Sequence, residues 1–370
     1  MILRHFQYTC VFIYAKKGTG AKRLYNFNLN YISFIYICLL LHHSISRERC
    51  EEGLKRENVK QIYDMKKTFH LCLSGGDEVI FRDLEDYHRG FNSLALALYY
   101  TDSTGLVESF MSTHTHQLIQ TSHLKDYTKA FRLSYGMYFN HKYQRNGRLG
   151  ENDFFTLEVV GHNHILAAAS YALRNPVHHG VTPTPYAYPH CSANAIFRRE
   201  MGKFLDEKLL TYKSYARFLG KRAEYPSSYK MTESGVFTRE SVLDIPQIEF
   251  MYGTPRAFNY YMNRKSSEEW AAEQLRDDNG LPPISLLSIE HGVNMHDPSK
   301  MSIFENGKAD YRKISDIELC TELDSFARNR FGRHSVYQLT IKEKQEIAEF
   351  LYRSRHLGEA QIRRCLVLPK

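Results

Sequence analysis

The chain has no apolar run long enough to cross a membrane as a helix. Its longest run, YISFIYICLLL, spans residues 31–41 and has eleven residues, whereas a membrane-spanning helix needs about 18 or more. The run begins thirty residues into the chain, and no small-residue cleavage site follows it, as one would in a secretory signal. We therefore expect a cytoplasmic protein with no membrane partner.

Cysteine is scarce, and the cysteines are not paired along the sequence. No two form a C-x-x-C motif, and their spacing is irregular. This pattern argues against a disulfide framework and against a structural zinc knuckle, and it favours a reducing compartment. The seven cysteines lie at positions 10, 38, 50, 72, 191, 320 and 365.

Basic charge is in excess mainly at the start of the chain. The 370 residues carry a net charge of +8, but residues 1–64 hold ten Lys and Arg against five Asp and Glu, which leaves +3 for the rest. A net charge this small is compatible with DNA binding and is no evidence for it. The glycine-rich phosphate-binding loop of nucleotide hydrolases is also missing, which argues against a reaction driven by ATP.

Composition divides the chain into four segments. Residues 1–64 are rich in Ile, Tyr, Phe, Asn and Lys and lack an amphipathic period. We interpret them as a non-functional leader or an over-long start, with Met65 as the natural beginning; a membrane-associated leader is the alternative. Residues 65–205 are predicted to form one ordered domain, 206–313 a linker or extension, and 314–370 a helical region.

Strand and helix patterns alternate from residue 68 onward. Short β-branched and aromatic runs predict strands, and apolar spacings of three and four predict helices. The alternation predicts an α+β fold in which helices pack on one small antiparallel sheet. Strands are expected within 68–73, 105–121 and 154–160, and helices over 83–100, 122–143, 162–175 (stopped by Pro176) and, less regularly, 241–261.

The C-terminal region carries two helix-start signals. Ser315 and Thr340 are each followed three residues later by Glu, which is the spacing of a capping box. The second helix turns at 356–358 into a short helix over 359–367. Two helices joined by a tight glycine-containing turn are typical of a helix-turn-helix and equally of an ordinary helical hairpin.

Basic residues on the last helix favour the DNA-binding alternative. Arg363 and Arg364 are adjacent there, and arginines on such a helix contact phosphates in many DNA-binding proteins. We therefore predict that both contact DNA.

Two histidines lie in a run that reads as a strand. In STHTHQLIQ, His114 and His116 are two residues apart, so on a strand both side chains project from the same face. Two neutral imidazoles side by side make half of a metal site. They are also compatible with two satisfied polar residues on a solvated sheet face.

A tyrosine and an amide share one face of the helix predicted before Pro176. Tyr171 and Asn175 are four residues apart, and on a helical projection both lie well away from the aliphatic stripe that includes Ala169 and Leu173. We therefore predict that Tyr171 is not a core residue.

Three motifs in order resemble one known family. They are FMSTHTHQLIQ, GRLGENDF and YALRNPVHHGVTPTPYAYPHCS, and the resemblance covers roughly residues 68–195. This part of the chain resembles the single-tyrosine HUH transposases of the insertion-sequence-200-like type, and among them the REP-associated tyrosine transposases. The resemblance implies an HUH endonuclease fold of the ferredoxin/RRM-like kind.

The same resemblance implies a chemistry and a set of roles. Tyr171 would be the catalytic nucleophile, forming a 5′-phosphotyrosine, and His114, His116 and Asn175 would hold one divalent ion, Mg²⁺ or Mn²⁺. Imidazole ligands make Mn²⁺ at least as suitable as Mg²⁺. The partner would be single-stranded or hairpin DNA, and a homodimer is an assembly that the resemblance allows.

The chain departs from the family pattern at a few positions. Thr115 stands where a hydrophobic residue is usual between the histidines, and Ser112 and Thr113 stand where Pro-Asn is common. His190 occupies a position where Trp is common. None of these changes removes a proposed ligand or the nucleophile, so they bear on substrate recognition more than on chemistry.

Two other functions have to be weighed against this one. A metal hydrolase of the amidohydrolase kind also begins with H-x-H on a strand, but it needs a long βα repeat that is not seen here. A DNA-binding protein with an idle nuclease site, acting through the C-terminal helices, is the main alternative.

The sequence does not identify the base that deprotonates Tyr171: His164 shares its face but lies about 10.5 Å away along the helix axis. His162 and His164 would point apart on a helix and make a poor metal pair.

Overall fold

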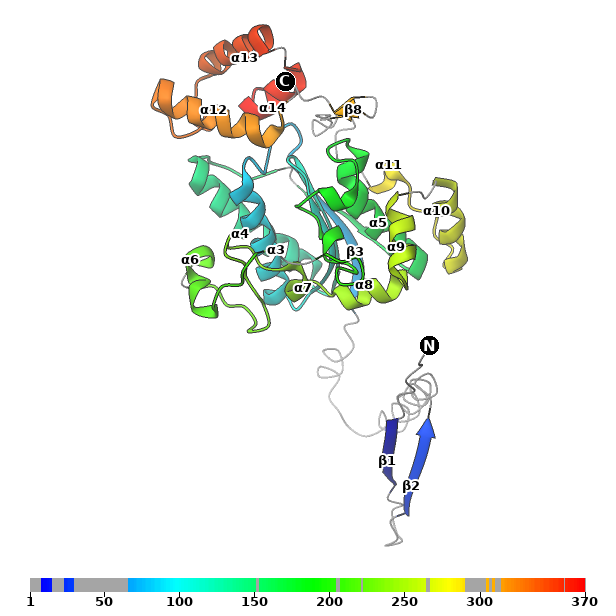
Figure 1. Cartoon of the computed structure of the whole chain (residues 1–370). Helices are drawn as coiled ribbons and strands as arrows, with labels where there is room; N and C mark the ends of the chain where they lie inside the picture. Colours follow the sequence, from blue (N-terminus) through cyan, green and yellow to red (C-terminus); the bar gives the residue numbers. More distant parts are fainter. Residues whose placement is uncertain are drawn as a thin grey trace. The chain divides into compact units, whose positions relative to one another are not determined.

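The chain forms two compact units, Met1–Asp64 and Met65–Lys370 (Figure 1). In the first unit, β1 (Tyr8–Tyr14) pairs antiparallel with β2 (Arg23–Leu29); the apolar run at 31–41 lies outside the described residues. Whether residues 1–64 belong to the functional protein stays a prediction. The computed structural model describes residues 8–14, 23–29, 66–150, 153–203, 207–220, 222–263, 267–289, 304–305, 308–309, 314–355 and 357–369.

One four-stranded antiparallel sheet organises the second unit. Its strands are β3 (Lys67–Ser74), β4 (Thr104–Phe110), β5 (His114–Thr121) and β6 (Phe155–Glu158), in the order β4-β5-β3-β6. The run predicted as one or two strands forms β4 and β5, joined by a short turn. The α+β prediction is confirmed, and an antiparallel sheet of this kind lacks the parallel βα repeat of an amidohydrolase.

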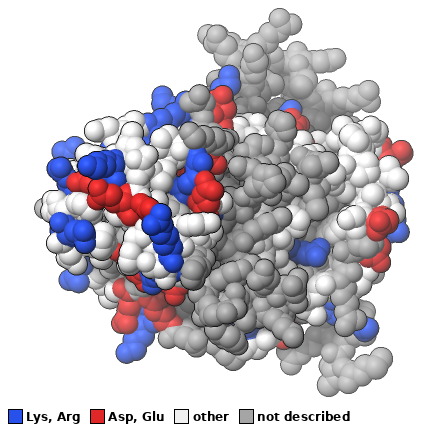
Figure 2. Space-filling model, turned by 90° about the horizontal axis from the view of Figure 1, so that it is seen from above, with Lys and Arg blue, Asp and Glu red and all other residues white. Residues whose placement is uncertain are grey.

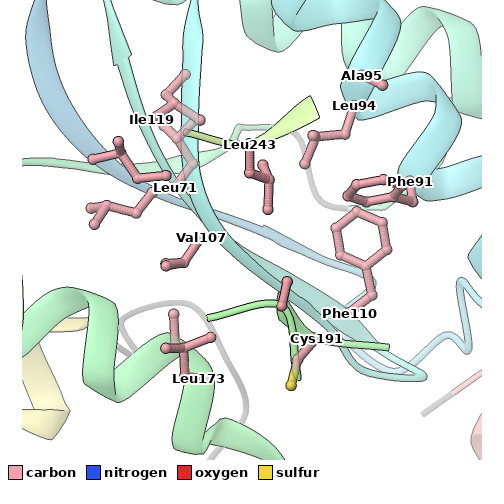
Figure 3. Close-up of a cluster of buried hydrophobic side chains, with 14 of the residues drawn as sticks. Leu71, Phe91, Leu94, Ala95, Val107, Phe110, Ile119, Leu173, Cys191 and Leu243 are labelled. Carbon is pink, nitrogen blue, oxygen red and sulfur yellow. The ribbon is translucent and has the colours of Figure 1, made fainter. Parts of the chain in front are cut away.

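Helices cover both faces of this sheet. α3 (Leu84–Tyr100) and α4 (Leu124–Tyr143) cover one face, and α5 (His162–His178) covers the other (Figure 1). Side chains on β4 alternate accordingly: Val107 points toward Leu173 of α5, whereas Phe110 lies beside Phe91 of α3 (Figure 3). The aliphatic and aromatic side chains between these layers form the main hydrophobic core.

Helix α5 differs from its prediction in two ways. It continues through Pro176 to His178, because a proline this close to the helix end removes one terminal hydrogen bond rather than a central one. Asn175, expected away from the buried stripe, is fully buried. The reason is that α5 packs against the sheet with one face and against the short helices of residues 245–274 with another, so few of its positions face solvent.

Residues 207–289 fold as short segments, several of which add side chains to the main core, among them Phe237, Ile248 and Phe258. The helix expected over 241–261 is broken into three, with a stop at Gly253, whose φ is +76°. These segments are η3 (Tyr212–Ser214), α6 (Ala216–Leu219), α7 (Arg239–Val242), α8 (Ile245–Tyr252), α9 (Pro255–Asn263), α10 (Ser267–Gln274), η4 (Leu275–Asp277) and α11 (Leu286–Ile289); η1 (Pro185–Ala187) and η2 (Ser192–Asn194) precede them, and β7 (Phe304–Glu305) and β8 (Lys308–Ala309) follow.

The C-terminal helices match their predicted pattern. They are α12 (Asp316–Phe331), α13 (Ile341–Arg355) and α14 (Glu359–Leu366), with η5 (Val336–Gln338) between the first two. The capping box at Ser315 is present, and Thr340 and its glutamate exchange the equivalent hydrogen bonds. Among the described residues, no helix is both long and apolar enough to cross a membrane.

Buried polar contacts dock the C-terminal helices onto the sheet domain. Arg82, which is fully buried, donates from Nε to Asp324 Oδ2 of α12 (3.0 Å) and from Nη1 to the carbonyl of Cys365 in α14 (3.0 Å). Ser112, in the turn just before the histidine strand, donates to Asp316 Oδ2 (2.9 Å). Breaking one side of such a buried network leaves an uncompensated polar group, so α12–α14 are built into this unit.

Candidate active site

The two histidines of the H-x-H motif lie on one face of β5. His114 and His116 are the first and third residues of the strand, and both are fully buried. Their ring centroids are 5.0 Å apart. The same-face prediction is confirmed, because a strand has a side-chain period of two. The imidazoles face α5 and are covered, so the alternative of a solvated sheet face does not hold.

Helix α5 places an amide between the two imidazoles. His114 Nε2 lies 3.1 Å from Asn175 Oδ1, and Asn175 Nδ2 lies 3.1 Å from His116 Nε2. Asn175 Nδ2 also donates to the Tyr171 hydroxyl over 3.5 Å, and the rings of Tyr171 and His116 meet edge to face at 5.4 Å. Four side chains that the sequence singled out therefore meet in space, two from the strand and two from the helix.

A fifth residue, which sequence reasoning missed, extends this cluster. His70 Nε2 of β3 lies 3.0 Å from His116 Nδ1, and the two rings stack at 5.1 Å. His70 is fully buried, and its Nδ1 has no hydrogen-bond partner among the described residues. No motif marks His70 in the sequence; its place follows from the register of β3 and β5, in which the neighbouring Cys72 pairs with His116.

The hydrogen bonds assign a tautomer to His116. Because Asn175 Nδ2 is a donor, His116 Nε2 accepts, and the ring proton is then on Nδ1, facing His70 Nε2. Burial and the adjacent imidazoles, that of His114 first, lower the pKa of His116 well below its ordinary value. A neutral imidazole whose Nε2 is unprotonated is the form that binds a metal.

The donor set fits a divalent ion that has two imidazole ligands and one amide oxygen. Both Nε2 atoms face the Asn175 amide, that of His114 its oxygen and that of His116 its nitrogen, so a bound ion would replace these two hydrogen bonds and would require the His114 ring proton on Nδ1. Within the described residues, no three His, Cys, Asp or Glu side chains gather into a metal site, so Asn175 Oδ1 would have to be the third protein ligand. A three-ligand set leaves coordination positions for substrate oxygen.

Two more histidines lie next to this cluster. His179 is buried, with its ring 5.2 Å from that of His114, and the exposed His178 has its ring 6.2 Å from that of Tyr171. Both follow the predicted nucleophile in the stretch NPVHHG, where sequence reasoning gave them no role.

His164 is committed elsewhere. Its Nδ1 lies 2.7 Å from Asp277 Oδ2, and Asp277 also accepts from the backbone N–H groups of Asn163 and His164 at 3.0 and 2.9 Å. His164 thus anchors residues 275–277 to the start of α5 and does not serve Tyr171. His162 is exposed and His164 buried, so this second histidine pair does not converge.

This anchor gives stability a defined pH dependence. Burial alone raises the pKa of Asp277, but hydrogen bonds from His164 and Asn163 outweigh it and lower the pKa from its ordinary 3.8 to about 2. A carboxyl group whose pKa is lower in the folded than in the unfolded protein stabilises the fold at pH values above its unfolded-state pKa. This stabilisation is lost as the pH falls through its folded-state pKa.

We therefore expect the wild-type protein to be more stable than Asp277→Asn above about pH 4, with the difference shrinking toward pH 2. Urea-unfolding midpoints of both proteins, measured across this range, check it. A difference that stays constant from pH 5 to pH 2 would contradict the assignment.

The two arginines predicted to contact DNA occupy different environments. Arg364 is 2% exposed, and its Nε and Nη2 each donate to Asp316 carboxylate oxygens at 2.7 Å. Its role is to close α14 against α12, so a phosphate contact by Arg364 is at odds with the structure. Arg363 lies on the outer side of α14, partly exposed, within 3.7 Å of Glu359.

The surface around these helices is mixed in charge. On the face seen in Figure 2, the Lys and Arg side chains of the described residues are interspersed with Asp and Glu. Arg355 pairs with Glu322, and Arg353 with Glu349 at 2.7 Å. The small net charge is thus spread out rather than gathered into one basic band on this face.

Part of this chain is similar in structure to most of a known transposase. A comparison with solved structures finds a REP-associated tyrosine transposase bound to a REP hairpin, at 13% sequence identity and a TM-score of 0.30. The match covers 41% of this chain and 86% of the other chain. This likeness is weak and concerns the fold alone. The chain matches none of the protein-family models and none of the curated proteins with which it was compared.

Proposed function

We propose that this protein is a metal-dependent DNA endonuclease and strand transferase that acts on single-stranded or hairpin DNA through Tyr171. The observation that supports it best is the meeting of a phenol, an amide and two imidazoles between α5 and β5. Asn175 joins all three partners, at 3.1, 3.1 and 3.5 Å. Tyr171 is only partly buried, which leaves part of its side chain accessible to a substrate.

The proposed reaction is a transesterification. Tyr171 Oη forms a bond to the phosphorus, and the bond between phosphorus and the 3′ oxygen breaks. The phenol gives up one proton and the leaving 3′ oxygen takes up one, so no net proton is consumed. The products are a 5′-phosphotyrosine and a free 3′-OH. The covalent bond conserves the phosphodiester energy, so rejoining to another 3′-OH needs no ATP.

The divalent ion would be held by His114, His116 and Asn175, and it would neutralise charge on the attacked phosphate. His70 would act as a positioning residue, since its Nε2 accepts from the far nitrogen of His116 and thereby fixes the orientation of that ring. The phosphodiester substrate would contribute the oxygens that complete the coordination.

Replacing His70 tests this support. We expect His70→Phe to weaken the apparent affinity for Mn²⁺ by about 10- to 100-fold, as removal of an outer-shell partner does elsewhere. His70→Gln keeps an acceptor near His116 and should lose less. The apparent Mn²⁺ affinity of each variant is measured from the dependence of the cleavage rate on Mn²⁺ concentration. An unchanged affinity in His70→Phe would show that His70 does not support the metal ligands.

The C-terminal helices are proposed to help choose the DNA site. Arg363→Glu should lower the slope of log affinity against log salt by about one unit, as expected for one lost phosphate contact. Arg364 is unsuitable for this test, because a glutamate there would lie buried against Asp316. Arg217, an exposed residue of α6 at the opposite end of the unit (Figure 1), is the matched control. Equal slopes for Arg363→Glu and wild type would exclude the contact.

Incubation with labelled single-stranded hairpin DNA and Mn²⁺ tests the function as a whole. We expect strand cleavage and a covalent protein–DNA adduct that survives denaturation. DNA binding with neither product would favour the alternative of an idle nuclease that only binds DNA. A location in the cytoplasm and a homodimeric state stay predictions.

A further inference from the structure

A pocket opens directly beside the proposed nucleophile. Its volume is about 500 Å³, and Tyr171 and Arg174 of α5 form one wall. Trp270 and Ala271 of α10, with Ile284 from the following loop, form the other. Its size is in the range of pockets that hold a small organic ligand, and the hydrolysis or transfer of a phosphodiester does not by itself require such a space.

We propose that this pocket binds the base of the nucleotide next to the phosphate that Tyr171 attacks. The inference rests on the proposed function and adds to it a subsite built from residues 267–289, which lie outside the part of the chain that carries the HUH motifs. The pocket and the nucleophile share a wall, so DNA that presents a phosphate to Tyr171 brings a neighbouring base to the pocket entrance.

Arg174 supplies the charge that a nucleotide needs. It lies three residues after Tyr171, on the same side of α5, and both line the pocket. Its Nε is buried and has no hydrogen-bond partner within the described part of the chain. Arg174 as a whole is only partly buried and lines the pocket, so its guanidinium is suited to bind a phosphate or a base carbonyl oxygen there.

Trp270 supplies the stacking surface. It is the only tryptophan of the chain, it is partly exposed, and its ring lies 5.1 Å from that of Tyr261. Bases stack on aromatic side chains with little regard to sequence, because every base presents a π-face. An aromatic ring opposite an arginine is the combination that single-stranded DNA binders use.

Two hydrogen-bonded links hold this wall in place. The side chain of Gln274, 1% exposed, accepts from the N–H of Ile284 (2.7 Å) and donates to the carbonyl of Trp270 (3.1 Å). Asp277 fastens the same segment to the start of α5. These bonds join α10 to the loop that carries Ile284 and join the end of the same segment to α5.

The single tryptophan makes the proposal directly testable. The full chain carrying Tyr171→Phe, which is expected to bind DNA without cutting it, is titrated with a short mixed-sequence single-stranded oligodeoxynucleotide. The control probe is a chain of equal length in which every nucleotide is abasic, so that its phosphate charge is the same. We expect saturable quenching of the Trp270 fluorescence by the first probe and not by the second. Equal quenching by both, or none while anisotropy shows binding, would overturn the proposal.

Substitutions at Trp270 give a second measurement that does not depend on quenching. With a dye-labelled oligonucleotide, Trp270→Leu should weaken binding about 5- to 150-fold, the range for loss of one base–aromatic stack. Trp270→Phe should lose less, and neither should change affinity for the abasic chain. Arg174→Gln should weaken both probes. A Trp270→Leu variant that is folded, as judged by its thermal midpoint, and binds like wild type would refute the base site.

Different results would contradict the base subsite and the proposed function. If the protein with Tyr171 intact forms a covalent adduct but Trp270 shows no base-dependent response, the subsite is wrong and the proposed function stands. If neither DNA binding nor an adduct is observed, both are wrong.

Discussion

Tyr171→Phe is expected to abolish DNA cleavage and adduct formation while leaving stability and DNA affinity nearly unchanged. The substitution removes one oxygen and keeps the ring that packs edge to face on His116. Tyr171 is partly buried, and the hydrogen bond that its hydroxyl accepts from Asn175 Nδ2 is long, 3.5 Å, so loss of this bond costs little in folding. Covalent catalysis has no substitute for the missing nucleophile.

The structure also selects the control for this experiment. Tyr186 and Tyr188, in and next to η1, are the nearest tyrosines in the sequence after α5. Tyr188 is buried and donates to the carbonyl of Phe110 at 2.6 Å, so Tyr188→Phe would cost stability. Tyr186 bonds to Asn259 at 3.3 Å, and Tyr186→Phe should keep full activity. Cleavage by Tyr171→Phe at the wild-type rate would refute the nucleophile assignment.

Loss of the proposed metal ligands should be almost as severe. We expect His114→Ala and His116→Ala each to lower the cleavage rate by about 100-fold or more, the size seen when a key electrostatic stabiliser is removed. On a solvated sheet face, the alternative that the sequence left open, loss of these imidazoles would cost little stability. Both are in fact fully buried and bonded to Asn175, so each variant should also lose about 1–3 kcal/mol for the partner left unsatisfied.

Activity therefore has to be compared at a temperature where both variants are folded, as judged by circular dichroism. Asn175→Ala should be milder in activity, because two imidazoles remain to hold the ion. EDTA should abolish wild-type cleavage, and added Mn²⁺ should restore it. Cleavage that continues unchanged in EDTA would exclude the metal role, whatever the histidine variants do.

Local periodicity accounts for what the sequence predicted of the site. The period of two along β5 places His114 and His116 on one face, and the helical spacing of four places Tyr171 near Asn175. These relations depend only on neighbours along the chain. The convergence of the two pairs depends on α5 packing on the β5 face, which the residues themselves do not specify and which only the family resemblance implied.

The features of the site that could not be predicted from the sequence depend on contacts between segments far apart along the chain. His70 joins His116 across 46 residues through strand register, and Arg364 pairs with Asp316 across 48 residues. The sequence around Arg364 does not indicate that this arginine will be buried against Asp316 at the start of another helix. Trp270 approaches α5 in the same way, after a segment whose short, interrupted helices have little periodicity.

Peptide mapping of the trapped adduct tests the central claim most directly. Wild-type protein is incubated with labelled hairpin DNA and Mn²⁺, the covalent complex is isolated, and the modified peptide is identified by mass spectrometry after proteolysis and nuclease digestion. The expected result is a nucleotide remnant joined through a phosphate to Tyr171 in the peptide of helix α5. A remnant on any other residue would contradict the assignment.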